Sequence, residues 1–272
     1  MGNVLQRPSR AVHPTDPCCI QGPKLSENVG MLDGPIAIVG ATGAVGSALA
    51  RRLCRRAIRV LAIGRDPERL QSLGAELGIA TIPLAGAAPA QVAAALEQAA
   101  AETKLAGIAH CVGSLLLKPA RTTSDAEWAA VLETNLSSAF GVARVVPQVV
   151  ANGGSVAFVS SVAAQLGLAN HEAIAAAKAG VEGLMRALAA GNLRRGIRCN
   201  CVAPALVQSR MTEAMLARPG VLETCNQRNP LGRIGTPDDV ARALEFLLDP
   251  EQSWLTGQVL AVDGGFGAVQ AP

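Results

Sequence analysis

Three polar side chains occur where the sequence pattern predicts apolar ones. Asn135 follows Trp128 by seven residues and so falls on the apolar face of a predicted helix. Lys178 falls on the apolar stripe of another predicted helix, and Ser161 follows the strand-like run Val156–Val159. Burial of an amide or an ammonium group costs free energy unless the group has a partner. A single such residue is usually a satisfied core group, but three at one edge of a sheet indicate a site, in which serine and lysine can polarise a carbonyl group.

A glycine-rich turn, GATGAVG over residues 40–46, follows the first predicted strand and opens the first predicted helix. Glycines in such a turn permit a tight bend and close approach of the backbone, so that phosphate groups can bind the N–H groups at the helix start. A purely structural glycine turn is the alternative. We expect a dinucleotide here, bound by these residues of the turn: Gly40, Thr42, Gly43, Val45 and Gly46.

The second predicted strand ends at Gly64, and Arg65 and Asp66 follow it directly. An acid at this place would bind the ribose 2′-hydroxyl of NAD, whereas an arginine would suit the 2′-phosphate of NADP. Because Arg65 stands nearer the strand end, the sequence favours NADP(H), with NAD(H) as the alternative. A solvated Arg65, and an Asp66 that caps the helix beginning at Pro67, would instead be structural.

Short runs rich in Val and Ile alternate with longer amphipathic stretches from Pro35 onward. The short runs are Ile36–Val39, Val60–Ile63, Thr81–Leu84, Ile108–Val112, Ser155–Ser160, Arg198–Ala203 and Val259–Val262. The amphipathic stretches are Val45–Cys54, Pro67–Leu77, Pro89–Thr103, Ser124–Val150, Asn170–Ala190 and Pro237–Leu248. This alternation predicts an α/β fold with a doubly wound, parallel, seven-stranded sheet of Rossmann type. Since no break in composition divides residues 34–272, we expect a single domain there.

The composition excludes several classes of function. The 272 residues carry 24 basic and 21 acidic side chains, and the net charge of +3 gives no case for nucleic acid or a membrane surface as partner. No apolar run is long enough for a transmembrane helix. Seven cysteines without Cys-x-x-Cys spacing and three scattered histidines predict neither a disulfide framework nor a metal site. These features favour the cytoplasm.

Residues 1–33 contain several prolines and no helical or strand periodicity, so we expect a disordered N-terminal extension. Because Arg7 and Arg10 precede any acidic residue, an organelle-targeting peptide is the alternative, which would place the protein in a stroma or matrix. The simpler interpretation is an upstream start, with Met31 beginning the compact domain.

Over residues 34–272 the sequence resembles the short-chain dehydrogenase/reductase family. GIRCNCVAP at 196–204 is similar to the family segment GIRVNAVAP, and TGQ at 256–258 with VDGG at 262–265 is similar to its C-terminal motif. Asn135, Ser161 and Lys178 match the family's helix asparagine, catalytic serine and catalytic lysine. HCVG at 110–113 stands where the family has Asn-Asn-Ala-Gly. The resemblance also implies cofactor contacts from a further set: Cys111, Gly113, Lys178, Pro204, Val207 and Ser209, the last in place of a threonine that holds the carboxamide.

The chain contains no tyrosine, and the tyrosine position of the family's Tyr-x-x-x-Lys motif is Ile174. In the family this tyrosine transfers a proton to or from the substrate oxygen, and the lysine ammonium lowers its pKa. Ala85 and Ala205 are two smaller departures from the family pattern. His171, three residues before Ile174 on the same helical stripe, is the candidate replacement. An exposed residue in the first helical turn is the alternative interpretation of His171.

The resemblance implies an NADP(H)-dependent oxidoreductase that transfers a hydride to or from a carbonyl or hydroxyl group of a small molecule, with an acid other than tyrosine. Lys178 would bind the nicotinamide ribose, and Asn135 would order a water beside it. Ser161 would hold the substrate oxygen, and His171 or a water molecule would complete the proton path. The alternative is a catalytically inactive nucleotide-binding subunit. The family's four-helix interface implies a homodimer or homotetramer.

Overall fold

Short runs of β-branched residues form a parallel sheet in the computed structural model, which describes residues 34–270. The strands are β1 (Ile36–Val39), β2 (Val60–Gly64), β3 (Ala80–Pro83), β4 (Leu105–His110), β5 (Val150–Val159), β6 (Arg198–Pro204) and β7 (Val259–Val262). Every neighbouring pair is parallel, in the order β3-β2-β1-β4-β5-β6-β7. The predicted doubly wound, seven-stranded sheet is therefore confirmed.

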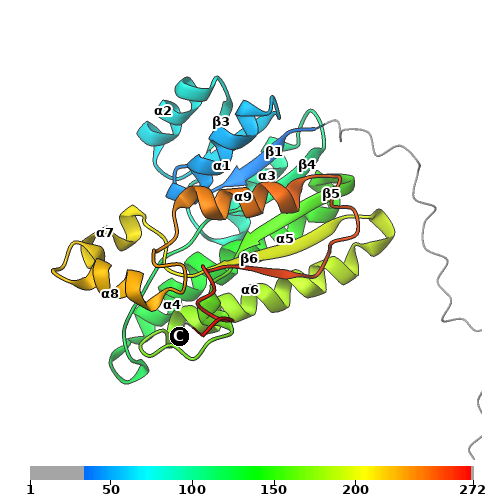
Figure 1. The fold of residues 1–272 in the computed structure, drawn as a ribbon. Coiled ribbons are helices and arrows are strands. Elements are labelled where there is room, and N and C mark those ends of the chain that lie inside the picture. Colours follow the sequence, from blue (N-terminus) through cyan, green and yellow to red (C-terminus); the bar gives the residue numbers. More distant parts are fainter. Residues whose placement is uncertain (1–33, 271–272) are drawn as a thin grey trace, which may run out of the picture.

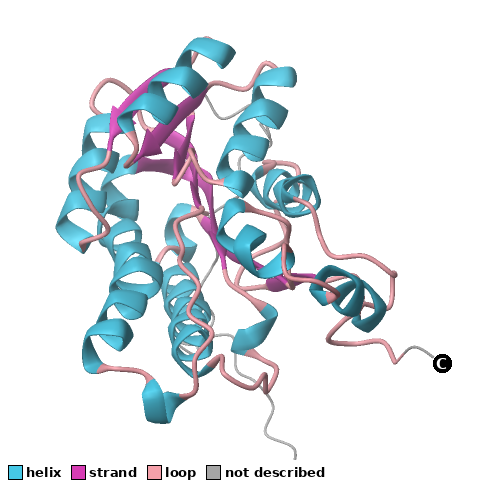
Figure 2. Cartoon of the chain, turned by 90° about the vertical axis from the view of Figure 1, so that its left-hand side faces the viewer, coloured by secondary structure: helices cyan, strands magenta, loops and turns pink. Residues whose placement is uncertain are grey.

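Helices cover both faces of this sheet (Figures 1 and 2). They are α1 (Ala44–Arg55), α2 (Pro67–Leu77), α3 (Pro89–Ala99), α4 (Asp125–Leu132), α5 (Ser138–Val149), α6 (Glu172–Gly191), α7 (Arg210–Leu216), α8 (Val221–Arg228) and α9 (Pro237–Leu248). One apolar core lies between the sheet and α1, α2 and α9, and another between the sheet and α3, α5 and α6. Both faces of the central strands are therefore buried, which explains their continuous apolar sequences. No helix within residues 34–270 is long and apolar enough to cross a membrane.

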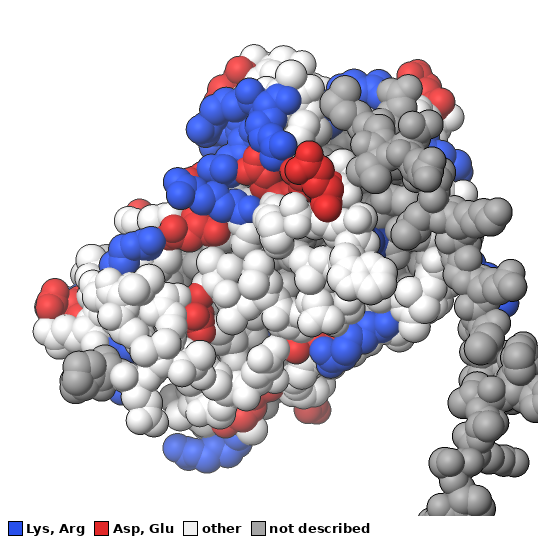
Figure 3. Space-filling model, turned by 45° about the vertical axis from the view of Figure 1, so that its right-hand side comes forward, with Lys and Arg blue, Asp and Glu red and all other residues white. Residues whose placement is uncertain are grey.

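Ion pairs tie two helices of the first layer together. Arg52 Nε lies 2.6 Å from Glu245 Oε2, and Arg56 Nη1 lies 3.1 Å from Glu245 Oε1, which joins α1 to α9. In the upper part of Figure 3 basic and acidic side chains lie next to one another, rather than in a field of one sign. This arrangement agrees with the small net charge of the chain.

The stretch predicted as one helix over Ser124–Val150 is divided in the structure. A π-helical turn at Glu133–Ser137 separates α4 from α5, and Ser138 N–H donates to Glu133 O, five residues earlier. Because the wider turn changes the rotation per residue, a spacing of seven no longer keeps two side chains on one face. Asn135 is fully buried, whereas Trp128 is 41% exposed, so the prediction that Trp128 marks a buried face was wrong.

The strand order reverses next to β1, between its neighbours β2 and β4. In open α/β sheets ligands bind outside the carboxyl ends of the strands at such a reversal. The segments that follow β1, β2, β4, β5 and β6 all leave the sheet at this edge. The fold therefore brings together the residues that the sequence singled out after separate strands.

Candidate active site

A cavity of about 800 Å³ lies at the carboxyl ends of the strands. Its floor comes from the turns after β1, β4 and β5, and its outer wall from α7 and α8, which project beyond the sheet edge in Figure 1. Most of the residues selected from the sequence line it: Gly43, Val45, Cys111, Gly113, Asn135, Ser161, His171, Lys178, Pro204, Val207 and Ser209. Gly40, Thr42, Gly46 and Arg65 do not line it directly.

The glycine turn is packed so tightly that larger residues do not fit. Gly40 has φ +87°, and a Cβ there would lie 2.9 Å from the carbonyl carbon of Cys111. A Cβ on Gly46 would lie only 2.4 Å from Gly40 O. Helix α1 begins at Ala44, and Ala44 and Val45 line the cavity. The N–H groups of a first helical turn have no partner within the helix, so the turn presents donors to the cavity.

In the turn after β2, the adjacent side chains of Arg65 and Asp66 have different roles. Asp66 caps α2, because its Oδ1 accepts the N–H of Arg69 at 3.1 Å. Its Oδ2 lies 3.4 Å from Arg69 Nη1, so this carboxylate is held within its own turn. Arg65 is exposed at the strand end. Arg69 lines the cavity and donates through Nη2 to Thr42 O at 2.7 Å.

The segment after β4 passes close to the centre of the cavity. A Cβ on Gly113 would lie 3.2 Å from Asn135 Oδ1 and 3.6 Å from Lys178 Nζ, so glycine leaves open the space in front of both groups. Cys111 also lines the cavity, but burial raises the pKa of its thiol to about 12, which keeps it protonated. This Cys is therefore a small apolar wall residue rather than a nucleophile.

His110 is a buried polar residue that sequence analysis did not assign to the site. Its Nε2 lies 2.9 Å from Ser138 Oγ, whose hydroxyl donates to Thr134 O at 2.6 Å. This geometry places the ring proton on Nε2, and Nδ1 has no partner in the described part of the chain. Burial lowers the pKa of His110 to about 3, and the charge of Lys178 acts in the same direction. His110 is consequently a neutral core residue.

Asn135 is held by three hydrogen bonds. Its Nδ2 donates to Ser114 Oγ at 2.9 Å and to Val131 O at 3.0 Å, and its Oδ1 accepts the N–H of Ser114 at 3.2 Å. One lone pair of Oδ1 remains available beside Gly113. The π-helical turn thus fixes an amide oxygen at the cavity, close to the ammonium group of Lys178.

Two adjacent serines follow β5, and their hydroxyl groups differ in availability. Ser160 Oγ donates to Glu182 Oε1 at 2.8 Å, and Glu182 is buried on α6. Ser161 Oγ accepts the N–H of Ala163 at 3.2 Å, which leaves its own proton free to be donated. Of the pair, Ser161 is therefore the serine whose hydroxyl can bind an oxygen atom of a ligand.

Lys178 is a buried cation without a carboxylate partner. Its Nζ donates to Val159 O at 2.8 Å, and its side chain reaches the cavity from α6. Burial lowers the pKa of Lys178 to about 8, while the neighbouring thiols of Cys201 and Cys111 oppose this change. An ammonium group with spare donors in a pocket of low polarity is suited to bind hydroxyl oxygens and to stabilise negative charge.

His171 and Ile174 both line the cavity beside Ser161. Helix α6 begins at Glu172, two residues after the start of the predicted stretch Asn170–Ala190, so His171 is the N-cap residue that precedes its first turn. His171 Nδ1 lies 2.8 Å from Ala169 O, which can only accept, so Nδ1 carries a proton. Nε2 is consequently the nitrogen that can exchange a proton with a ligand.

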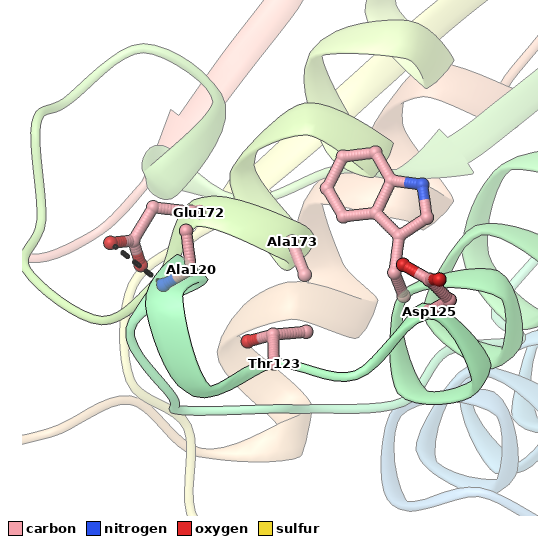
Figure 4. Close-up of a pocket in the computed structure, with 6 residues that line it drawn as sticks. Ala120, Thr123, Asp125, Glu172 and Ala173 are labelled. Carbon is pink, nitrogen blue, oxygen red and sulfur yellow. Dashed lines mark hydrogen bonds between the residues drawn. The ribbon is translucent and has the colours of Figure 1, made fainter.

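A smaller pocket of about 260 Å³ lies outside this site, between the start of α4 and the start of α6. In Figure 4 the carboxylate of Glu172 points toward the backbone N–H of Ala120, at 3.4 Å. Asp125 and Thr123 border the same pocket. Glu172 does not line the large cavity, so its carboxylate is not available there as an acid.

The outer wall of the cavity is attached to the sheet at its base. Val207 forms a parallel bridge with Gly235, and Gln208 N–H donates to Gly235 O at 2.9 Å. Ser209 begins α7, where its N–H donates to Thr212 Oγ1 at 3.0 Å. These bonds hold Val207 and Ser209 in place, and both residues line the cavity together with Pro204.

A parallel sheet that carries a tightly packed glycine turn at its strand-order reversal is typical of Rossmann-type folds, the class of fold that binds dinucleotides. A family model described as enoyl-(acyl carrier protein) reductase matches residues 40–267. The chain belongs to the short-chain dehydrogenase/reductase family, whose members are oxidoreductases that use nicotinamide cofactors.

Individual relatives match nearly the whole chain. Galactitol 2-dehydrogenase (L-tagatose-forming) of Cereibacter sphaeroides is 34% identical over 244 residues, which cover 86% of this chain and 96% of the relative. The 3-oxoacyl-(acyl-carrier-protein) reductase of Escherichia coli is 32% identical over 247 residues, 86% and 97% of the two chains. A crystal structure of a short-chain dehydrogenase/reductase family oxidoreductase from Burkholderia thailandensis has 32% identity and a TM-score of 0.79, with 87% and 94% coverage.

Proposed function

We propose that this protein is an NADP(H)-dependent oxidoreductase that transfers a hydride to or from a carbonyl or hydroxyl group of a small molecule. The observation that carries the proposal is that Ser161, Lys178 and His171 line one cavity together with the glycine turn. Each offers a different chemical group: a hydroxyl group from Ser161, an ammonium group from Lys178 and an imidazole ring from His171. Because Ile174 occupies the family's tyrosine position, the site lacks the family's phenol group but keeps the serine and the lysine.

The cavity residues fit a pyridine dinucleotide. The crowded glycine turn and the start of α1 would bind its phosphates, and the space that Gly113 leaves open before Asn135 and Lys178 would admit its ribose. Cys111, Pro204, Val207 and Ser209 would border the nicotinamide. When bound, this cofactor supplies or accepts the hydride.

NADP(H) is favoured over NAD(H) by the turn after β2. Asp66 is occupied as the cap of α2, so its carboxylate is not free to bind ribose hydroxyls. The guanidinium groups of Arg65 and Arg69 follow the same strand, where a 2′-phosphate would be bound. We therefore propose that these two arginines together provide the preference for the phosphorylated cofactor.

The chain's own groups can complete the proton transfer. Ser161 would donate a hydrogen bond from its hydroxyl group to the substrate oxygen, and the Lys178 ammonium would stabilise negative charge that develops there. In carbonyl reduction, the imidazolium form of His171 would give its Nε2 proton to the substrate oxygen, which would leave a neutral imidazole and the alcohol. In the reverse direction, neutral Nε2 accepts the alcohol proton. Asn135 would hold a water beside Lys178 for exchange of protons with solvent.

Cofactor titrations followed by a substrate screen test this proposal. We expect NADPH to bind more tightly than NADH by fluorescence titration, and a panel of aldehydes and ketones to support NADPH oxidation. His171→Gln should lower kcat about 10²–10⁴-fold without changing the Kd of NADPH. Glu172→Gln is the matched control, because Glu172 is adjacent to His171 in sequence but its carboxylate faces the smaller pocket. The Glu172→Gln variant should retain the wild-type kcat.

Three results would overturn parts of the proposal. Absence of NADPH binding would remove the dinucleotide site. Binding without turnover over the whole panel would assign the chain to the nucleotide-binding, non-catalytic subunits. Wild-type turnover in His171→Gln would leave the oxidoreductase but remove the histidine from the proton path.

Self-association and location complete the proposal. Trp128 and Phe140 on α4 and α5 are 41% and 45% exposed, and Trp254 near β7 is 94% exposed. Figure 3 also shows a broad area without charged side chains. Exposed apolar surface of this kind favours a homodimer or homotetramer, which light scattering would measure. We propose a cytoplasmic location, or an organelle if residues 1–33, which lie outside the described residues, are a targeting peptide.

A further inference from the structure

The charges in the large cavity are all of one sign. Its described lining residues include no Asp or Glu, whereas four are arginines or lysines, namely Arg69, Lys178, Arg210 and Arg228, in addition to His171. A cavity with several cations and no carboxylate attracts anionic groups.

Two of the four lie at the glycine turn. Arg69 Nη2 and Arg210 Nη2 lie 2.7 Å and 3.4 Å from Thr42 O, so both guanidinium groups converge on the dinucleotide side of the cavity. Lys178 is the third, and its ammonium group lies beside Asn135 at the proposed centre of reaction. Arg228, at the end of α8 in the outer wall, is not explained by the cofactor.

No carboxylate in the described chain neutralises Arg228. Its side chain forms no hydrogen bond or ion pair within residues 34–270. The nearby Glu223 accepts a hydrogen bond from Gln227 Nε2 at 2.8 Å. The Asp263 carboxylate accepts the N–H groups of Gly265 and Gly267 at 2.9 Å and 2.8 Å. The carboxylates of Glu223 and Asp263 are therefore engaged elsewhere, while Arg228 keeps its donors for a ligand.

The backbone on which Arg228 stands is anchored. The following residue, Asn229, is buried, and its Nδ2 donates to Asp263 O at 2.8 Å. Asn229 Oδ1 accepts the N–H of Leu231 at 3.1 Å, which fixes the end of α8 against the segment after β7. Apolar residues complete this side of the cavity, among them Met215 and Phe266.

We infer that the substrate is a carbonyl compound, or its alcohol, that bears a carboxylate group bound by Arg228. The inference rests on the proposed function and specifies its substrate class. The single positive charge of Arg228 balances the single negative charge of a carboxylate, whereas a phosphate dianion carries two negative charges. The planar guanidinium also matches a carboxylate through two parallel hydrogen bonds. The apolar residues beside Arg228 would contact the carbon chain between the carboxylate and the reacting carbonyl group.

Paired substrates test this inference. Straight-chain oxo acids of increasing length are compared with their methyl esters, which keep the carbonyl group and the chain but lack the charge. For the best chain length we expect kcat/KM of the acid to exceed that of the ester about 10- to 100-fold, mainly through KM. Arg228→Gln should reduce this ratio to about one, because the charge-assisted hydrogen bonds are lost. Arg218→Gln removes an exposed arginine of the same wall that does not line the cavity, and it should keep the wild-type ratio.

Equal rates for acids and esters in the wild-type protein, or an unchanged preference in Arg228→Gln, would overturn the inference. If instead the proposed oxidoreductase function is wrong, neither the acids nor the esters will support NADPH oxidation. In that event calorimetric titration of the same acids and esters into the NADPH-loaded protein decides the matter. Tighter binding of acid than ester, abolished by Arg228→Gln, supports the carboxylate site, and equal binding refutes it.

Discussion

Replacing Lys178 by methionine should stabilise the cofactor-free protein at neutral pH. Lys178 is 5% exposed, and burial lowers its pKa from 10.5 to about 8. At 1.36 kcal/mol for each pKa unit, holding the ammonium group in the folded state costs about 3 kcal/mol. Methionine keeps much of the side-chain volume and loses only the hydrogen bond to Val159 O, which contributes about 1 kcal/mol. The variant should therefore gain about 2 kcal/mol in free energy of unfolding.

The gain should depend on pH in a defined direction. Below about pH 8 both the folded and the unfolded chain hold the lysine proton, so the cost of burial is complete. Between about pH 8 and 10.5 the folded protein has released this proton and the unfolded chain has not, so the cost falls as pH rises. At about pH 9.5 the cost is about 1 kcal/mol, which the lost hydrogen bond offsets. Wild type and variant should then have about equal stability.

Urea unfolding at the two pH values measures this difference. Lys118→Met is the control, since Lys118 is partly exposed and lies 2.8 Å from Glu127 Oε2. It should lose no more than about 1 kcal/mol, with the same sign at both pH values. The reasoning is refuted if Lys178→Met is less stable than wild type at neutral pH, or if its advantage does not shrink at the higher pH.

Two further predictions concern the site. Ile174→Tyr places a phenol at the cavity one helical turn before Lys178, whose charge would lower the pKa of the phenol. The kcat for carbonyl reduction should therefore rise about 10- to 100-fold in steady-state assays. An unchanged kcat would show that the phenol does not reach the substrate. Gly46→Ala forces a Cβ to 2.4 Å from Gly40 O, so it should weaken NADPH binding at least about tenfold by fluorescence titration. Gly183→Ala on α6 is the control, because the new Cβ meets no neighbouring element within 4 Å; it should leave NADPH binding intact and add about 0.5–1 kcal/mol to the free energy of unfolding. Equal NADPH affinity in the two variants would contradict the packing argument.

The sequence predicts the sheet well because local and tertiary preferences agree there. Runs such as Ile36–Val39 are apolar throughout, as burial on both faces requires, and Pro and Gly separate them from the helices. Helix starts are equally legible where a cap side chain is present, as at Thr236, which accepts the N–H of Asp239. Boundaries differ by a few residues where strands extend past their apolar part, as in β5, which begins at Val150.

The candidate site was predictable only in part. Periodicity identified Asn135 and Lys178 because polar groups interrupt apolar stripes, yet it did not reveal the π-helical turn that exposes Trp128. Arg69 and Arg228 were missed because an arginine on a helix surface carries no signal in sequence spacing. Their position at the cavity follows from tertiary packing, which brings α2 and α8 to the same edge of the sheet.

The π-helical turn at Glu133–Ser137 also has a consequence for how this chain can change in length. Deleting one residue from the turn would let α4 and α5 merge into a regular helix, with better backbone geometry, but would rotate the amide of Asn135 out of register with Gly113. The most stable backbone and the backbone that presents this amide thus differ by one residue. Selection for stability alone would shorten the segment, so its present length is explained by the position of the Asn135 amide at the cavity rather than by backbone stability.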